Sequence, residues 1–260
     1  MSKNKLSGTG VLVTRPVGQA MPLLEAIKDI GGAPHLFPGV EIVEKEGSEI
    51  ASSLSRAASA QLLIFVSPTA ARIAMKATAR KRGLLDCMQV AAVGQSTADE
   101  LIKHGVREII VPDKGSGSEA LLGCTQLKHV AGKSVLVVRG EGGSDLLATA
   151  LRGRGAEVSF LECYRRVLPE GRFAEIEPLL RDGRIAAWTA TSGEIVDNLF
   201  YFAGKHGDLL QKTPLFVNHS NVAARAFSRA VKTIFVAAGG DTGLARSVAN
   251  WFSRFRPEMD

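Results

Sequence analysis

The stretch Val11-Leu-Val-Thr-Arg15 returns later in the chain as Val135-Leu-Val-Val-Arg139, displaced by 124 residues (139 − 15). In both copies a short β-branched run, typical of a buried parallel strand, ends in an arginine. The helical stretch that follows each copy stops at a glycine, Gly31 or Gly155, again 124 residues apart (155 − 31). Glycine is favoured just after a helix end, where the backbone turns left-handed. The sequence therefore predicts a repeated strand–helix unit.

Further segments recur at nearly the same displacement. They are residues 65–72 with 188–195, 95–98 with 220–223, and 115–119 with 239–243. One weak match arises by chance, but several in order at a nearly constant displacement predict a tandem duplication.

Short β-branched runs alternate with helical segments through both copies. This alternation predicts an α/β fold with two similar doubly wound parallel-sheet domains. The runs expected as buried parallel strands are Val11–Thr14, Leu62–Val66, Val90–Val93, Ile109–Val111, Val135–Val138, Ala186–Thr189, Leu215–Val217 and Ile234–Val236. The expected helices are Pro68–Arg82, Ser96–His104, Ser118–Leu122, Ser192–Phe202, Val222–Ala230 and Leu244–Trp251. Serines stand where helix N-caps are expected, at Ser67, Ser96, Ser118, Ser192 and Ser220.

Two segments break the alternation. Val40–Val43 and Val158–Tyr164 alternate apolar and polar residues, and polar stretches follow them. We interpret both as linkers where the chain passes between two domains, which a length of 260 residues can accommodate.

Composition narrows the class of protein. The net charge of +6 favours anionic partners, but basic residues cluster only at Arg80–Arg82 and aromatic residues make up 6% of the chain. Nucleic acid is therefore not an expected partner. No apolar run approaches the roughly 20 residues needed to cross a bilayer, and no signal peptide is recognisable at the N-terminus. We expect a cytoplasmic protein without a membrane partner.

Cofactor and nucleophile motifs are absent from the sequence. Cys87, Cys124 and Cys163 are widely spaced and predict buried or free thiols, not a metal site. Gly132-Lys133-Ser134 precedes a strand and lacks the first glycine of a phosphate-binding loop. No GxGxxG, HExxH or GxSxG motif occurs. We therefore expect chemistry without metal, nucleotide or covalent nucleophile.

Glycine- and hydroxyl-rich turns follow the predicted strands. In open α/β sheets ligands bind at this carboxyl edge, where helix N-termini favour carboxylate or phosphate. Arg15 and Arg139 end their strands at the same edge and could bind carboxylates bidentately. Taken alone, each serine or threonine there is more typical of a helix cap than of a ligand contact. Together the turns predict a large ligand with many anionic groups. They include Ser67, Gly94 and Thr97, Gly140 to Ser144, Thr191 and Ser192, and His219 and Ser220.

The chain resembles the uroporphyrinogen-III synthase family from about Val11 to Trp251. Each matching segment is short, and the resemblance depends on their common order and spacing. The segments are Val13–Pro16, Phe65–Pro68, Val93–Ala98, Ser118–Leu122, Val138–Glu141, Cys163–Arg166 and Gly239–Gly243.

The resemblance implies two α/β domains joined by a two-stranded linker, residues 1–37 with 167–260 and residues 38–166. It also implies a monomeric, cofactor-independent lyase of porphyrin and haem biosynthesis. Its substrate would be hydroxymethylbilane, a linear tetrapyrrole with eight carboxylates. Ring closure with loss of water and inversion of the last pyrrole would give uroporphyrinogen III.

The same resemblance implies roles for particular residues. Tyr164 matches the family's tyrosine at the linker and is the candidate proton donor, although a tyrosine that only packs at a hinge fits equally well. Ser67 and Thr97 match hydroxyl residues of the family that bind substrate or cap helices. Trp188-Thr-Ala-Thr-Ser192 departs from the family's aromatic-Ser-Pro-Ser turn, so either Thr191 or Ser192 could contact substrate.

Two other functions remain open from sequence alone. The same fold could serve as a non-catalytic regulatory module that binds tetrapyrroles, or as a two-lobed receptor for another acidic metabolite. The receptor would need no tyrosine at the linker.

Overall fold

A computed structural model describes residues 6, 8–56, 59–78 and 88–255. The chain divides into two compact units, the first made of Met1–Glu41 with Val167–Asp260 and the second of Ile42–Arg166. The chain thus enters the second unit after Glu41 and leaves it after Arg166. The sequence predicted these crossings after residues 37 and 166.

The first unit contains a five-stranded parallel sheet in the order β11-β10-β9-β1-β2. Its interior strand β1 is fully buried and pairs with β2 on one side and β9 on the other. The strands are β1 (Gly10–Val13), β2 (Ala33–Leu36), β9 (Ile185–Ala190), β10 (Leu215–Val217) and β11 (Ile234–Val236).

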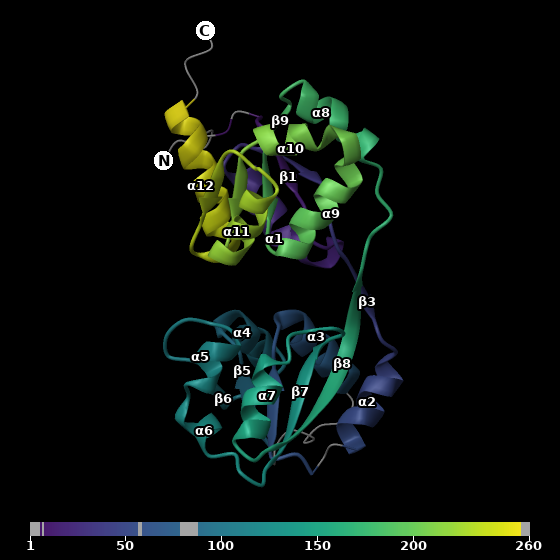
Figure 1. Ribbon diagram of the computed structural model, residues 1–260, viewed down its shortest axis with the longest axis vertical. Coiled ribbons are helices and arrows are strands. Elements are labelled where there is room, and N and C mark those ends of the chain that lie inside the picture. The colour runs from purple at the N-terminus through teal and green to yellow at the C-terminus, as the bar shows by residue number, and fades with distance from the viewer. Residues whose placement is uncertain (1–5, 7, 57–58, 79–87, 256–260) are drawn as a thin grey trace. The chain divides into compact units, whose positions relative to one another are not determined.

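Helices cover both faces of this first sheet (Figure 1). Val11 and Val13 of β1 pack against α1 and α12, whereas Trp188 of β9 contacts Phe200 of α9 at an edge-to-face ring distance of 6.4 Å. The helices are α1 (Val17–Asp29), α8 (Glu177–Arg181), α9 (Gly193–Ala203), α10 (Gly207–Lys212), α11 (Ser220–Ser228) and α12 (Gly240–Phe255).

The second unit contains a six-stranded sheet in the order β3-β8-β7-β4-β5-β6. Five of its strands, from β8 to β6, pair in parallel. The strands are β3 (Glu41–Glu44), β4 (Leu62–Phe65), β5 (Gln89–Ala92), β6 (Ile109–Ile110), β7 (Ser134–Gly140) and β8 (Glu157–Val167).

Alternate residues of β4 show that this second sheet is also covered on both faces. Leu63 and Phe65 pack in one core with α2, α3 and α4, and Leu62 and Ile64 in another with α5, α6 and α7. The helices are α2 (Gly47–Arg56), α3 (Pro68–Thr78), α4 (Gln95–Lys103), α5 (Ser118–Leu122), α6 (Thr125–Lys128) and α7 (Leu146–Gly153). The prediction of doubly wound parallel sheets is confirmed.

The strand orders agree with the displacement seen in the sequence. Moving β1, β2, β4, β5 and β6 along by 123 to 125 residues brings them onto β7, β8, β9, β10 and β11. When each strand of the first sheet is replaced by its counterpart in this correspondence, the strand order becomes β6-β5-β4-β7-β8. This is the order of the second sheet without β3. Each unit combines strands from both copies. The agreement favours a duplication, which remains a prediction.

Several local predictions were wrong. The edge strands β6 and β11 are only partly buried, because an edge strand has a neighbour on one side alone. The segment Val158–Tyr164 is not only a connection, since it lies within β8, between β3 and β7 in the sheet. The N-caps of α4, α5 and α11 are Gly94, Gly117 and His219, not the predicted serines Ser96, Ser118 and Ser220, which lie within the first turn of their helices.

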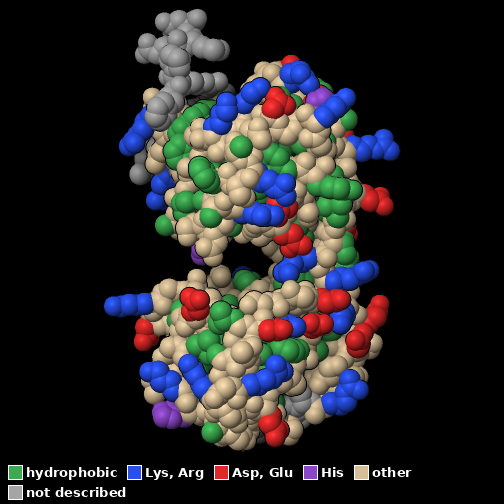
Figure 2. Space-filling view, viewed as in Figure 1, with side chains coloured by type: hydrophobic (Ala, Val, Ile, Leu, Met, Phe, Trp, Pro, Cys, Tyr) green, Lys and Arg blue, Asp and Glu red, His purple; other side chains and the backbone are tan. Residues whose placement is uncertain are grey.

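Charges of both signs are mixed on one face of the molecule. On the face shown in Figure 2, Lys and Arg side chains are interspersed with Asp and Glu instead of gathering into one patch. Among the described residues, no helix is both long and apolar enough to span a bilayer. Cys87 and the Arg80–Arg82 cluster lie outside the described residues.

Candidate active site

Two hydroxyl groups meet at the carboxyl edge of the second sheet. Ser67 follows β4, and its Oγ lies 3.3 Å from the phenolic oxygen of Tyr164, which lies in β8. The same Ser67 Oγ accepts a hydrogen bond of 3.0 Å from the backbone N–H of Ala70 and so caps α3. Tyr164 is buried. The pair connects the Tyr164 hydroxyl to the N-terminus of a helix of 11 residues.

Gly140 lies directly against the Tyr164 ring. A Cβ atom added to Gly140 would lie 2.5 Å from Cζ and 2.9 Å from Oη of Tyr164. A bulge between the two strands brings these residues together. Arg139 pairs with Glu162, and the next residue, Gly140, pairs with Tyr164, so the register shifts between Arg139 and Gly140. Glu141 N–H also donates to the Tyr164 carbonyl at 2.8 Å.

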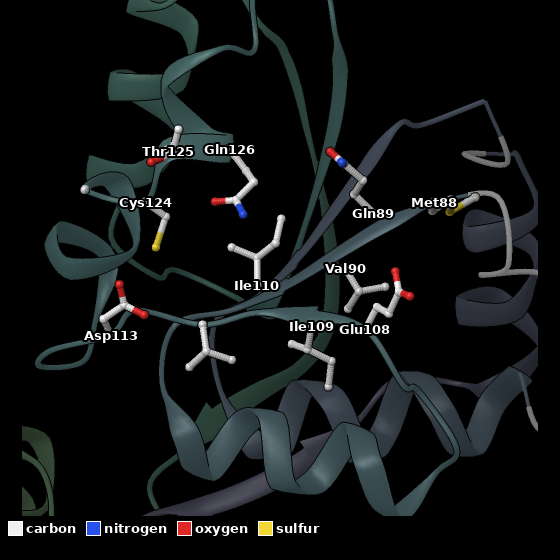
Figure 3. Close-up of a pocket in the computed structure, with 12 residues that line it drawn as sticks. Met88, Gln89, Val90, Glu108, Ile109, Ile110, Asp113, Cys124, Thr125 and Gln126 are labelled. Carbon is white, nitrogen blue, oxygen red and sulfur yellow. The ribbon is translucent and has the colours of Figure 1, made fainter.

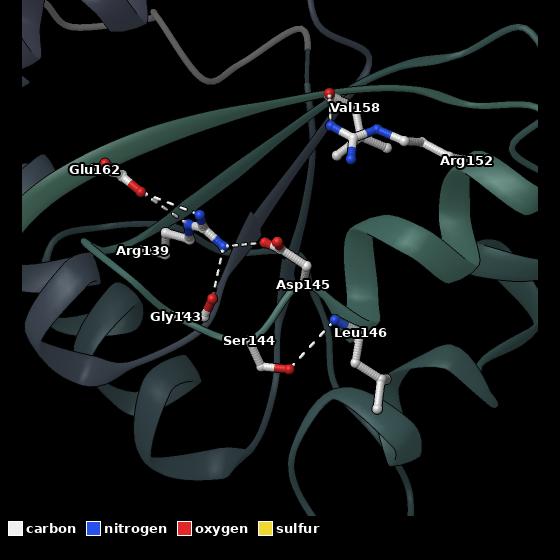
Figure 4. Close-up of polar contacts among 8 residues, drawn as sticks. All are labelled: Arg139, Gly143, Ser144, Asp145, Leu146, Arg152, Val158 and Glu162. Carbon is white, nitrogen blue, oxygen red and sulfur yellow. Dashed lines mark hydrogen bonds and ion pairs between the residues drawn. The ribbon is translucent and has the colours of Figure 1, made fainter. Parts of the chain in front are cut away.

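Arg139 is buried and its guanidinium is held by protein groups (Figure 4). Nη1 donates to Asp145 at 2.8 Å and to the Gly143 carbonyl at 3.1 Å. Nε and Nη2 donate to Glu162 at 3.3 and 3.1 Å. The guanidinium also stacks over the Phe160 ring, 3.7 Å from its centroid. Every nitrogen of this arginine therefore already has an acceptor.

The turn after β5 brings Gly94 and Thr97 to the same edge. Gly94 is the N-cap of α4, and an added Cβ there would lie 3.0 Å from Cβ of Ser116. Thr97 lies in the first turn of α4 and is 1% exposed. The structure thus places the predicted residues of the second unit, from Ser67 to Tyr164, around one sheet edge.

The carboxyl edge of the first unit is built around Arg15. This residue follows β1, and its guanidinium pairs with Asp241 in the first turn of α12. Its Nε is buried and has no hydrogen-bond acceptor among the described residues. The Oδ1 atom of Asn218, which follows β10 at this edge, is likewise buried without a donor in the described part of the chain.

The remaining predicted residues of the first unit start two helices. Ser192 is the N-cap of α9, and its Oγ accepts from Ile195 N–H at 3.2 Å, as a capping serine does. Thr191 directly precedes it and is partly buried. His219 is the N-cap residue of α11 without a side-chain cap bond, and both His219 and Ser220 are exposed.

One cavity of the second unit lies away from these residues. It has a volume of about 770 Å³ and adjoins β5, β6 and the start of α6, with Val90, Ile110, Cys124 and Gln126 among its lining (Figure 3). None of the predicted site residues lines it. This cavity is therefore separate from the predicted site residues.

Sequence reasoning assigned no individual role to four polar side chains at these edges. Asp145 and Glu162 bind Arg139, Asp241 binds Arg15, and Asn218 has a buried amide oxygen. A signal was available for Asn218 and Asp241, since each lies within a few residues of the end of a predicted strand. Glu162 lies within a strand, so only the sheet register brings it to Arg139.

The fold and the polar edges define a class, a two-unit α/β protein with hydroxyls, arginines and helix N-termini at the edge where such sheets bind ligands. The family model described as "Uroporphyrinogen-III synthase HemD" matches residues 22–242. The chain belongs to the uroporphyrinogen-III synthase family.

Individual relatives agree with this assignment. A uroporphyrinogen-III synthase of Salmonella typhimurium is 32% identical over 192 residues, which cover 73% of this chain and 78% of that protein. The enzyme of Proteus mirabilis is 34% identical over 159 residues, 60% of this chain and 80% of that protein.

Solved structures are similar in fold. A mutant uroporphyrinogen III synthase of the extremely thermophilic bacterium Thermus thermophilus superposes with a TM-score of 0.65 at 19% identity, over 95% of this chain and 100% of that one. The Helicobacter pylori enzyme gives a TM-score of 0.59 at 12% identity, over 94% of this chain and 99% of that one. At these identities the likeness shows the fold alone.

Proposed function

We propose that this protein converts hydroxymethylbilane into uroporphyrinogen III, with loss of water and inversion of the last pyrrole ring. The observation that carries the proposal is the family match across residues 22–242, together with a relative that is 32% identical over 73% of this chain. The reaction places the protein among the cyclising lyases of tetrapyrrole synthesis.

Loss of the terminal hydroxyl requires a proton donor, and we assign that role to Tyr164. Ser67 Oγ accepts from Ala70 N–H, which leaves the serine's own proton available for Tyr164 Oη at 3.3 Å. The phenolic proton is then free to pass to the departing hydroxyl as the C–O bond breaks. A hydrogen bond from Ser67 would stabilise the tyrosinate that remains, beside the positive end of α3.

Control of product is a matter of orientation. The azafulvene left after water departs is electrophilic enough to close the ring without help, and unassisted closure gives the unrearranged isomer. The protein must hold the last pyrrole so that its substituted carbon attacks the azafulvene first, which forms a spiro intermediate. Positioning of reacting groups can contribute several kcal/mol to such a preference.

Carboxylates of the substrate supply the means of holding it. Arg15 pairs with a single acidic residue and has a buried Nε without an acceptor in the described residues, so it can exchange Asp241 for a substrate carboxylate. Backbone N–H groups in the first turns of α3, α4, α9 and α11 favour anions at the same edges. Gly94, Thr97, Thr191, Ser192, His219 and Ser220 belong to these turns.

Further properties belong to the proposal. We expect catalysis without a metal or organic cofactor, because the sequence holds no cofactor motif and the family resemblance implies none. We also expect a monomer in the cytoplasm that binds neither nucleic acid nor membrane. Sedimentation at several protein concentrations would test the monomer.

The decisive experiment supplies freshly generated hydroxymethylbilane and separates the oxidised porphyrin isomers by chromatography. Mostly type III product, without added metal or nucleotide, is the expected result. Type I product alone, formed at the rate of a protein-free control, would overturn the proposal and favour a non-catalytic tetrapyrrole-binding or receptor role.

A further inference from the structure

We infer that Gly140 and Arg139 are positioning residues for the Tyr164 hydroxyl, and that Arg139 does not bind substrate. The inference rests on the proposed function, in which Tyr164 gives the proton. It assigns different roles to the two arginines that end the repeated strands. Arg15 binds the substrate, whereas Arg139 holds the proton donor in position.

The first step concerns the space that Gly140 leaves open. An added Cβ would lie 2.5, 2.6 and 2.9 Å from Cζ, Cε2 and Oη of Tyr164. Ordinary carbon contacts begin near 3.5 Å, so an alanine would displace the ring by on the order of 1 Å. The hydrogen bond to Ser67 is already 3.3 Å long and would be lost. Position 140 therefore needs glycine to leave room for the Tyr164 ring, and not to allow a special backbone conformation.

The second step concerns the backbone on both sides of the ring. Glu141 N–H donates to the Tyr164 carbonyl, and the bulge between β7 and β8 sets Gly140 opposite Tyr164. A bulge is a common means of re-aiming one side chain of a strand. Here it directs Tyr164 toward Ser67 at the end of β4.

The third step concerns Arg139, the residue just before the bulge. Its guanidinium ties Glu162 of β8, two residues before Tyr164, to Gly143 and Asp145 of the loop that follows Gly140 (Figure 4). Its side chain is 10% exposed, and two carboxylates face it. A substrate carboxylate would have to displace one of them at a buried site. The geometry instead fits an internal clamp across the bulge.

The contrast with Arg15 supports this division. Arg15 contacts one carboxylate, Asp241, and keeps a buried Nε without an acceptor among the described residues. A buried unpaired donor is costly unless a ligand or water satisfies it. The two arginines occupy equivalent places in the repeat and have different surroundings.

Fluorine NMR tests the inference directly, because the chain contains only two tyrosines, Tyr164 and Tyr201. Protein labelled with fluorotyrosine gives one resonance for each, and the Tyr164→Phe variant assigns them. We expect Gly140→Ala to move the Tyr164 resonance and leave the exposed Tyr201 resonance in place. Gly153→Ala in α7 of the same unit is the matched control, since its added Cβ would meet nothing within 4 Å. An unmoved Tyr164 resonance in Gly140→Ala overturns the inference.

The activity measurement follows on the same proteins. We expect kcat to fall roughly 10²-fold in Gly140→Ala, as displacements near 1 Å do in other enzymes, while Gly153→Ala stays close to wild type. In a Tyr164→Phe background, Gly140→Ala should lower kcat little further, because both replacements act through the Tyr164 hydroxyl. If Gly140→Ala does not fold, Glu162→Gln weakens the clamp at constant size and must move the Tyr164 resonance.

The results distinguish the two proposals. Type I product alone from the wild-type protein overturns the proposed function. Type III product from wild type and from an equally active Gly140→Ala variant overturns the positioning role alone. For Arg139, Arg139→Met should lower kcat with KM nearly unchanged, and a raised KM at full kcat would return it to the substrate site.

Discussion

Ser67 has two roles in its pair with Tyr164, one structural and one chemical. Ser67 Oγ caps α3 through Ala70 N–H and also reaches Tyr164. Replacement by alanine would remove both interactions, with different consequences. The cap affects stability, by about 1 kcal/mol in typical helices. The contact with Tyr164 affects the reaction.

We expect Ser67→Ala to lower kcat by about 10- to 100-fold, because a hydrogen bond to a charged group contributes about 1.5–3 kcal/mol. The isomer-resolved assay measures this loss. In a Tyr164→Phe background the same replacement should leave kcat unchanged yet still lower the free energy of unfolding, because the helix cap is lost there too. Equal losses of kcat in both backgrounds would show that Ser67 acts independently of the tyrosine.

Cys163 gives a second prediction at the scale of one residue. Burial raises the pKa of its thiol from an ordinary 9.0 to about 12, partly opposed by the nearby Lys45. Below pH 9 the thiol is protonated in both folded and unfolded states, so it adds no pH dependence. Between pH 9 and 12 only the unfolded chain releases the proton, and stability should fall by up to about 1.4 kcal/mol per pH unit.

Urea unfolding of wild type and Cys163→Ala at several pH values checks this. The variant starts from a lower stability because of the cavity, but its curve should fall less steeply above pH 9. Groups that titrate in both proteins cancel in the comparison. Parallel curves would show that the thiol ionises without an energetic cost in the folded state.

Single residues also mark how far sequence reasoning reaches. Ser67 and Ser192 were predicted as caps and accept the expected N–H bonds. At α4, α5 and α11 the helix begins one or two residues earlier, so a glycine or histidine takes the cap position. The pairing of Arg139 with Glu162 depends on strand register, which no local pattern specifies.

At the scale of elements, Asp197 connects two helices of the first unit. Its carboxylate on α9 accepts from Nε of Arg225 at 2.8 Å and from Nη2 of Arg229 at 2.7 Å, both from α11 or its C-cap. Partial burial raises the pKa of Asp197, but hydrogen bonds from the two arginines outweigh it and hold the pKa below 3.8. The carboxylate is therefore charged and paired at neutral pH.

We expect Asp197→Asn to lower the free energy of unfolding by about 1 kcal/mol at pH 7, since solvent screens this partly exposed network. Because the pKa of Asp197 is lower in the folded than in the unfolded state, its ionised form stabilises the protein at pH values above the unfolded-state pKa. This stabilisation is lost as the pH falls. The difference between wild type and variant should thus shrink below pH 3.8.

The control for this prediction is Asp208→Asn, which breaks an exposed pair with Lys212 within α10. Its effect should be clearly smaller, because a single i,i+4 pair on the surface contributes little. An Asp208 variant as unstable as the Asp197 variant would indicate that the connection between helices is unimportant.

The elements differ in how well the sequence specifies them. Central strands such as β1, β4 and β7 are continuous apolar runs buried on both faces, and they were predicted. The edge strand β2 was missed, since it carries Pro34 and His35 and is only partly buried. Proline is tolerated at a sheet edge, where one side needs no hydrogen bond, and such a strand lacks the usual apolar signature.

At the scale of the whole molecule, each unit has a core of its own. Leu23 is fully buried in the core of the first unit, and Leu101 in a core of the second. Both tryptophans, Trp188 and Trp251, belong to the first unit. Tryptophan fluorescence therefore reports on one unit, whereas circular dichroism reports on helices of both.

We expect Leu23→Ala to shift the unfolding midpoint seen by tryptophan fluorescence, and Leu101→Ala to shift only part of the circular dichroism signal. Each loss of a buried leucine should cost about 2–5 kcal/mol in its own unit. Multi-domain chains commonly depart from two-state unfolding. If Leu101→Ala moved the fluorescence midpoint as far as Leu23→Ala does, the units would unfold as one.

The order of strands along the chain has a consequence for biosynthesis. The second unit is contiguous, so it can fold on the ribosome as soon as residue 166 has emerged. The first unit cannot, because β1 lacks its neighbour β9 until Ile185 and later residues are made. At roughly 5–20 residues per second, the apolar strand β1 waits on the order of ten seconds or more without its partner. During that interval the nascent segment that contains β1 is a natural client for a chaperone.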